Sequence, residues 1–243
     1  MSEHAPQDTR QDLGDIVEPF SRPNTEADLA RNFLDTLFTY RNNCPIHTRY
    51  CWGFFVVRTC FAPGDEAHLS RAMLKLDRLI CSRIQIHREI AKLEDPGTYT
   101  DDAYLSVDAD IVRRYHNILI DDQKIEAAAI DDIKAHVRQW IADLPFKTRG
   151  GRYSAFLLLD EEVLCNIERM PDSISAEEWC EVWQRKDTEW VKLVDVHEEG
   201  EACRVWVWDL IEAFSLLCDF GYGVSEFPTS PDDLGCGWPF FEP

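Results

Sequence analysis

The chain has 243 residues, 45% of them hydrophobic, and carries 45 acidic against 25 basic side chains, a formal net charge of −20. Such a charge repels phosphate backbones and anionic lipid head groups over about a Debye length, which excludes nucleic acid and membrane surfaces as expected partners. No apolar run approaches the roughly 20 residues needed to cross a bilayer, and residues 1–28 lack the apolar stretch of a secretory signal. We therefore expect a soluble, intracellular protein of the cytoplasm.

The first 110 residues predict an arm, a short helix, a strand and a long helix. Proline and glycine interrupt residues 1–26, which have few periodic apolar positions and are expected to be a disordered arm. Apolar residues then repeat at helical spacing from Ala27 to Phe38. Residues 51–61 are rich in aromatic and β-branched side chains and predict a buried strand. A long helix follows, with one stripe along its length: Leu69, Met73, Leu76, Ile80, Ile84 and His87.

The rest of the chain predicts two more strand–helix units and a hairpin. A strand over 115–121 precedes a helix whose stripe starts at Ile130, and a strand over 153–160 precedes a short helix over 161–169. Ser175 and Glu178 form a capping box. Strands over 190–196 and 203–208 flank a short polar loop, which is typical of a hairpin, and a helix over 210–220 follows.

This order of elements predicts an α+β fold. Crossover helices bring successive strands parallel, whereas a short loop reverses them. We expect a mixed β-sheet of about five strands with helices packed on it, built as a single domain over 27–220. The arm over 1–26 precedes this domain, and a Gly/Pro/aromatic tail over 221–243 follows it.

Three blocks resemble a known family. They are Trp52–Thr59, Ile118–Asp122 with the following Ala127–Trp140, and Tyr153–Leu164. Together they are similar to an uncharacterised protein family of filamentous ascomycete fungi, over roughly the middle half of the chain. Val137 departs from the family pattern, which has an aromatic residue there. The family carries no assigned activity, so the resemblance implies three structural units and no catalytic residues.

Charged residues close each of the first three strands. If these strands are parallel, their carboxyl ends lie at one edge, the usual place for a site in an open sheet. An arginine there can clamp an anion, and carboxylates can hold a divalent cation. The alternative is that each acid caps the helix that follows and that the arginine pairs with one of them. The candidate ligand-binding residues are Arg58, Asp121, Asp122, Asp160 and Glu161.

The nine cysteines do not predict a disulfide scaffold or a metal site. They are scattered, odd in number and expected to be mostly reduced, buried thiols. Cys44, His47, Cys51 and Cys60 offer four soft ligands within a short stretch. Structural zinc draws on two close ligand pairs, whereas Cys51 and Cys60 are nine residues apart on one predicted strand. We expect no bound metal and no cofactor.

The eight tryptophans predict one heavily aromatic face. Trp206 and Trp208 alternate along a predicted strand and so share a side, and Trp179 and Trp183 are four apart on a predicted helix. These four residues either pack in the core or form a partner-binding surface, because tryptophan is enriched at interface hot spots.

No stretch carries a complete catalytic, metal or nucleotide signature. The expected function is therefore a non-catalytic protein-interaction or accessory role, with the chain itself or another protein as partner. The alternative is an enzyme or small-ligand binder at the carboxyl edge, with a role beside the enzymes of a fungal biosynthetic pathway. There, Arg58 would orient an anionic group and Asp121 or Asp160 would serve as metal ligand or general base.

Overall fold

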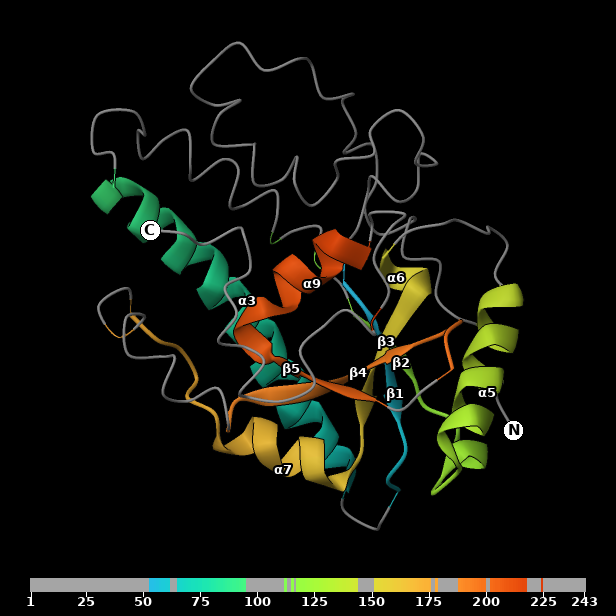
Figure 1. The fold of residues 1–243 in the computed structure, drawn as a ribbon. Helices are drawn as coiled ribbons and strands as arrows, with labels where there is room; N and C mark the ends of the chain where they lie inside the picture. Colours follow the sequence, from blue (N-terminus) through green and yellow to red (C-terminus); the bar gives the residue numbers. More distant parts are fainter. Residues whose placement is uncertain are drawn as a thin grey trace, which may run out of the picture.

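The structure is a computed structural model and describes residues 53–61, 65–94, 112, 115, 117–143, 151–175, 178, 188–199, 202–217 and 224. Its centre is a five-stranded sheet in the order β2-β1-β3-β4-β5 (Figure 1). The strands are β1 (Phe55–Arg58), β2 (Ile118–Ile120), β3 (Ala155–Leu159), β4 (Trp190–Asp195) and β5 (Cys203–Trp206). The predicted α+β fold with a mixed sheet is confirmed.

The first three strands run in the same direction. β1 lies between β2 and β3 and pairs in parallel with both, so that Phe55 is level with Ile118 on one side and Phe156 on the other. Helix α3 (Asp65–Glu94) leads from β1 to β2, and α5 (Ile130–Ala142) leads from β2 to β3. Crossovers of this kind return the chain to the same end of the sheet, so the three carboxyl ends meet at one edge.

The last three strands are antiparallel neighbours. Helix α7 (Glu161–Arg169) connects β3 to β4, and β4 pairs antiparallel with both β3 and β5. The predicted hairpin of β4 and β5 is therefore confirmed, and β2 and β5 form the two edges of the sheet.

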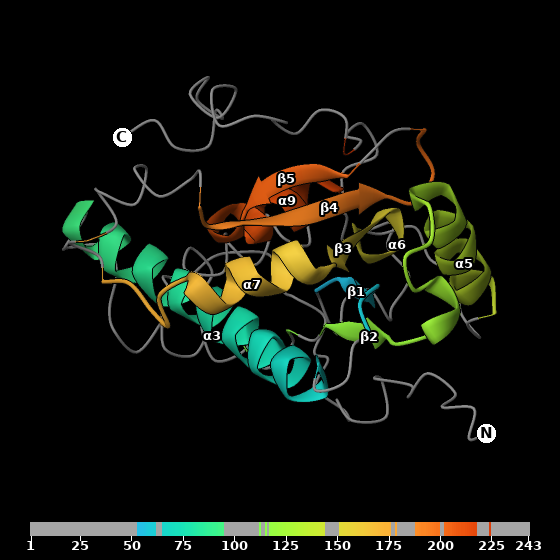
Figure 2. The same ribbon diagram turned by 90° about the horizontal axis from the view of Figure 1, so that it is seen from below.

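Alternating side chains of β1 build a core on each face of the sheet. Phe54 and Val56 pack with α3, α7 and α9 (Leu210–Leu217), and the Phe54 ring meets Phe214 edge-on at 5.5 Å. Phe55 and Val57 pack on the other face, where the Trp140 ring of α5 lies 4.9 Å from Phe55. Figure 2, turned by 90°, shows α5 on one side of the sheet and α3 with α7 on the other. Both faces of β1 are therefore buried, which explains why the strand reads as a continuous apolar run.

The predicted helix stripes are buried in part, because Met73 of α3 and Ile130 of α5 are only half-buried. In α3 the buried positions include Leu69, Leu76 and Ile80, and in α5 they include Ile133 and Val137. The remaining short elements are the 3₁₀ helices η2 (Gln123–Ile125) and η4 (Val207–Asp209) and the single-turn α6 (Gly151–Ser154). None of the described helices combines the length and the apolar character that a bilayer span requires.

One predicted strand ends earlier than expected. β5 stops at Trp206 and η4 starts at Val207, so the prediction that Trp206 and Trp208 share a strand face is wrong. Two long-range hydrogen bonds fix this change: the Trp208 indole donates to Glu189 Oε2 at 2.6 Å, and the Trp208 carbonyl accepts from Arg83 Nε at 3.2 Å. The alternating pattern of residues 205–208 predicts a strand, and the sequence of this short segment does not reveal that Trp208 bonds to residues far away in the chain.

Several sequence predictions lie outside the described residues. These are the arm over 1–26, the helix that begins at Ala27, and the tail over 221–243 except for Val224. The capping box, in contrast, is confirmed by two reciprocal bonds: Glu178 N donates to Ser175 Oγ at 3.2 Å, and Ser175 N donates to Glu178 Oε2 at 2.8 Å.

Candidate functional site

Arg58 and Asp121 meet at the carboxyl edge of the parallel strands. Val57 pairs with Ile120, so the next residue of each strand, Arg58 and Asp121, is level with its neighbour. Arg58 Nη1 lies 3.4 Å from Asp121 Oδ1 and 2.7 Å from Glu66 Oε1 in the first turns of α3. Its Nε donates to the Cys60 carbonyl at 2.6 Å. The guanidinium is therefore held by three protein groups.

The Arg58 side chain is 1% exposed, although both of its acidic partners reach solvent. Burial lowers the Arg58 pKa, but the hydrogen bond to Glu66 and the charges of Asp121 and Glu66 outweigh it and raise the pKa overall. The guanidinium also stacks over the Phe61 ring, 4.5 Å from its centroid. Glu66 is 77% exposed and Asp121 is 38% exposed, so the contact with Glu66 is the more open of the two to a molecule from solvent.

Asp122 caps the start of η2 and is not a partner of Arg58. Its Oδ1 accepts from Lys124 N at 3.0 Å, which caps η2, and its Oδ2 lies 3.5 Å from His136 Nε2 of α5. Asp122 thus makes the capping contact that the alternative interpretation of the strand-end acids requires.

Asp160 caps α7 and pairs with β4. Its Oδ1 accepts from Val163 N at 2.9 Å, and its Oδ2 contacts Lys192 Nζ at 2.5 Å. Burial lowers the Lys192 pKa, but hydrogen bonds to Asp160 and Glu162 reverse the effect and raise it. A side-chain cap of this kind stabilises a helix by about 0.5–2 kcal/mol. Glu161 is exposed in the first turn of the same helix.

Strand alternation divides the five predicted ligand residues. Arg58 is level with Leu159, so Asp160, one residue later, projects to the opposite side of the sheet. Among the described residues no ion pair joins Arg58 to Asp160, and Asp160 turns to Lys192 instead. The structure therefore brings Arg58 and Asp121 together and directs Asp122, Asp160 and Glu161 elsewhere.

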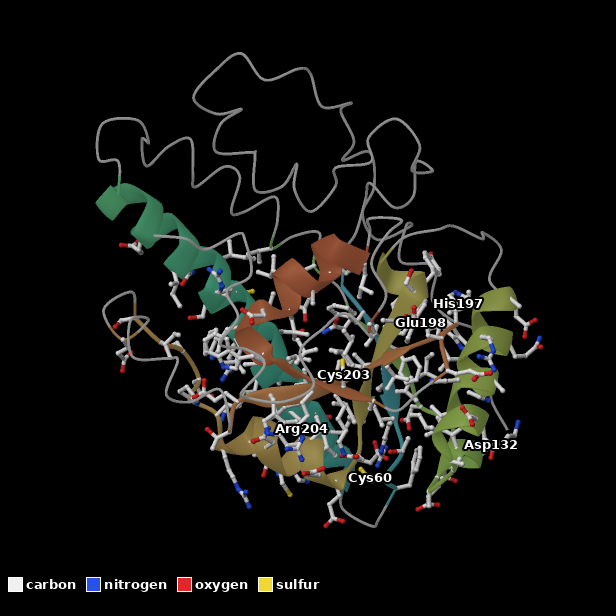
Figure 3. The ribbon with its side chains drawn as sticks, viewed as in Figure 1. Cys60, Asp132, His197, Glu198, Cys203 and Arg204 are labelled. Atoms are coloured by element: carbon white, nitrogen blue, oxygen red, sulfur yellow. The ribbon has the colours of Figure 1, made fainter. Side chains whose placement is uncertain are left out.

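Of the four residues considered as zinc ligands, one lies in the part of the chain that the structure describes. Cys60 is described beside the carboxyl end of β1 (Figure 3), where its Sγ donates to the Leu159 carbonyl at 3.9 Å, whereas Cys44, His47 and Cys51 lie outside the described residues. Within the described ranges, no group of three or more His, Cys, Asp or Glu side chains is arranged to hold a metal ion. Burial raises the pKa of the Cys203 thiol to about 12, which keeps it protonated and unreactive at neutral pH.

Two of the four tryptophans considered as interface residues lie among the described residues. Trp206 and Trp208 are 3% and 1% exposed and belong to the core on the α3 face. Trp179 and Trp183 lie outside the described residues. Trp206 and Trp208 therefore pack in the core, which is the first of the two alternatives given for them.

Leu119 of β2 is a residue that sequence reasoning missed. Ile118 N donates to Phe54 O at 3.0 Å, and alternate residues of an edge strand bond to the neighbouring strand, so Ile118 and Ile120 turn their backbone groups toward β1. Leu119 between them turns its N–H and C=O away from the sheet. Among the described residues none bonds to these two groups, and the Leu119 side chain is 38% exposed.

The opposite edge is built differently. Val207 N donates to Glu189 O at 2.9 Å, and bonded and non-bonded pairs alternate in an antiparallel ladder, so Arg204 turns its backbone outward from β5. Its guanidinium lies over the Trp190 ring, 4.1 Å from the centroid, and contacts Glu162 Oε1 of α7 at 3.2 Å. A charged side chain therefore protects the outward backbone of β5, whereas an apolar one accompanies that of β2.

The chain matches no protein-family model, no curated protein and no solved structure. Its relation to a fungal family stays a prediction, and its function has to be inferred from the residues described above.

Proposed function

We propose that this chain acts by binding another protein through the edge strand β2 and that it performs no catalysis of its own. One observation carries the proposal: Leu119 combines an outward N–H and C=O with a side chain that is 38% exposed. An edge strand with unpaired backbone groups is a template onto which an extended segment of a partner adds as a further strand.

The charged groups at the carboxyl edge support the same proposal. Arg58, Asp122 and Asp160 each bind a group of this chain, through ion pairs or helix caps. These contacts stabilise the ends of β1, η2 and α7. The arrangement favours a structural role for the strand-end charges and leaves the apolar edge as the surface suited to a partner.

Two arginine substitutions test the proposal. Leu119→Arg places on β2 the kind of charge that guards β5, and Leu74→Arg makes the same change at a leucine of α3 that is 57% exposed. We expect quantitative mass spectrometry of proteins captured from native extract to find partners held by the wild type and Leu74→Arg and lost by Leu119→Arg. The same set of proteins on all three baits would contradict the proposal.

A second function, binding of an anionic small molecule, is favoured by the Arg58 geometry. The 77% exposed Glu66 occupies one side of a buried guanidinium, so an incoming carboxylate or phosphate can take its place. Glu66→Gln then strengthens binding, because the competing charge is gone. A thermal-shift screen of anionic metabolites on the wild type, Glu66→Gln and Arg58→Lys tests this function. The same set of stabilising metabolites in all three proteins would contradict it.

A further inference from the structure

We infer that the partner of β2 presents an extended, basic segment, which adds to the sheet as a sixth strand beside Leu119. This inference rests on the proposed function and adds the chemistry of the partner. It follows from the way charge is distributed around the carboxyl end of β2.

The segment that follows β2 is acidic on its exposed side. Residues 117–143 contain six acidic and three basic side chains. Two of the basic groups are turned to the β4–β5 connection: Lys134 Nζ donates to the Glu198 carbonyl at 2.9 Å, and Arg138 Nη1 donates to the Val196 carbonyl at 2.8 Å. Figure 3 shows Glu198 beside α5, where these bonds form. Lys124 is the remaining basic residue of this range, and it lies 4.0 Å from Asp122.

The acids of the same segment stay on the surface. Glu126, Asp131, Asp132 and Asp143 are exposed, and Asp121 follows β2 directly. His136 lies 3.5 Å from Asp122, which fixes the middle of α5 beside the residues that follow the edge strand. A segment added along β2 therefore passes an acidic surface, and lysine or arginine side chains on it gain favourable Coulomb energy.

The same charges disfavour a second copy of this chain as the occupant. Pairing β2 with β2 brings two chains of formal charge −20 together with their acidic segments at one edge. Like charges at close approach oppose that association, most strongly at low ionic strength. A basic partner relieves the repulsion, whereas a second copy doubles it.

Fluorescence anisotropy with two labelled peptides tests the inference. The probes are short extended peptides of alternating lysine and valine or alternating glutamate and valine. We expect the lysine peptide to bind the full chain at least about tenfold more tightly than the glutamate peptide, with affinity that falls as salt rises. Equal or reversed preference would overturn the basic-partner inference.

Substitutions at Leu119 connect this binding to the edge. Leu119→Pro removes only the outward N–H, because the bonds to β1 come from Ile118 and Ile120, and proline is tolerated at such edge positions. Leu119→Arg supplies a second variant if the proline chain does not fold. Both should weaken the lysine peptide by about tenfold or more, whereas Leu74→Arg should retain the wild-type affinity.

The two possible failures are distinguishable. If the glutamate peptide binds better and Leu119→Pro abolishes that binding, the edge function stands and the basic partner is wrong. If the lysine peptide binds all variants equally, the attraction is general and both proposals fall. Concentration-dependent dimers that Leu119→Arg dissolves would show that a second copy is the occupant, which overturns the inference.

Discussion

Both edges of the sheet turn backbone N–H and C=O groups outward, but the exposed side chains that accompany these groups differ: one is apolar and the other is charged. At β2 the outward residue is Leu119, with an apolar side chain 38% exposed, and at β5 the outward residue with an exposed side chain is Arg204, which reaches Trp190 and Glu162. β5 also continues into η4, where Trp208 is held by Glu189 and Arg83. Within the described residues, one edge is thus closed by charge and tertiary contacts, whereas the other is open and has no hydrogen-bonded neighbour on its outer side.

The largest expected effect is at the closed edge. Trp208 is 1% exposed and its indole N–H bonds to Glu189. We expect Trp208→Ala to lower the free energy of unfolding by about 3–5 kcal/mol, through the cavity and the lost bond. Leu119→Ala at the open edge should cost less than about 1 kcal/mol. Denaturant unfolding of both variants measures the difference, and equal costs would remove the distinction between the edges.

Helix α3 braces both regions, and its Asp77 gives a pH-dependent effect of intermediate size. Its first turns hold Arg58 through Glu66, and Arg83 further along holds Trp208. Burial raises the Asp77 pKa from 3.8 to about 6. The folded state therefore binds the proton more tightly than the unfolded chain, so this contribution is complete below about pH 4 and is lost as the pH rises through 6.

Asp77→Asn should consequently stabilise the protein at pH 7, by at most about 3 kcal/mol, and leave it little changed at pH 4. Chemical denaturation across this pH range measures the effect. Asp131→Asn, at an exposed position of α5, controls for the removal of one negative charge. A gain at pH 7 of the same size in both variants would assign the effect to net charge instead of burial.

A smaller effect is expected beside the open edge. Ala127 adopts a positive φ of 52°, and its N–H donates to the Thr59 carbonyl at 3.4 Å, just beyond the end of β1. Glycine reaches this left-handed region without the clash of a Cβ atom. Ala127→Gly should therefore raise the free energy of unfolding by about 0.5–1 kcal/mol. If Ala127→Gly unfolds at a lower temperature than the wild type, the backbone of Ala127 is not strained.

The smallest effect on stability, and an informative one on association, is expected at Arg204. Arg204→Leu gives β5 the apolar outward residue of β2, while the side chain it loses is an exposed one. We expect a stability change within about 0.5 kcal/mol and increased self-association in sedimentation experiments. If the variant stays monomeric under conditions where the wild type does, side-chain charge is not what protects this edge.

The fold was predictable from sequence because its elements are locally marked. The apolar run of β1, the acid and stripe of α7 and the turn between β4 and β5 predict their elements without long-range information. Parallel strands then follow from the crossover helices, and the meeting of Arg58 and Asp121 follows from the parallel strands.

The rest of the candidate site depends on register and strand order. Arg58 is level with Leu159 and not with Asp160, so Asp160 lies on the other side of the sheet from Arg58. The local sequence does not encode this one-residue offset in register. Strand order makes β2 an edge and so gives Leu119 its exposure, although Ile118–Ile120 reads like any buried strand. The bonds of Glu189 and Arg83 to Trp208 span 19 and 125 residues, so the local sequence does not show where β5 ends.

Residue-resolved amide hydrogen exchange on β2, with and without the lysine–valine peptide, tests the central claim most directly. The Leu119 N–H should exchange rapidly in the unbound protein, faster than the Ile118 and Ile120 amides that bond to β1, and become protected when the peptide binds. The Arg204 amide should stay unprotected throughout. A Leu119 amide that is already slow in the unbound protein, or that remains fast at saturating peptide, would contradict association through this edge.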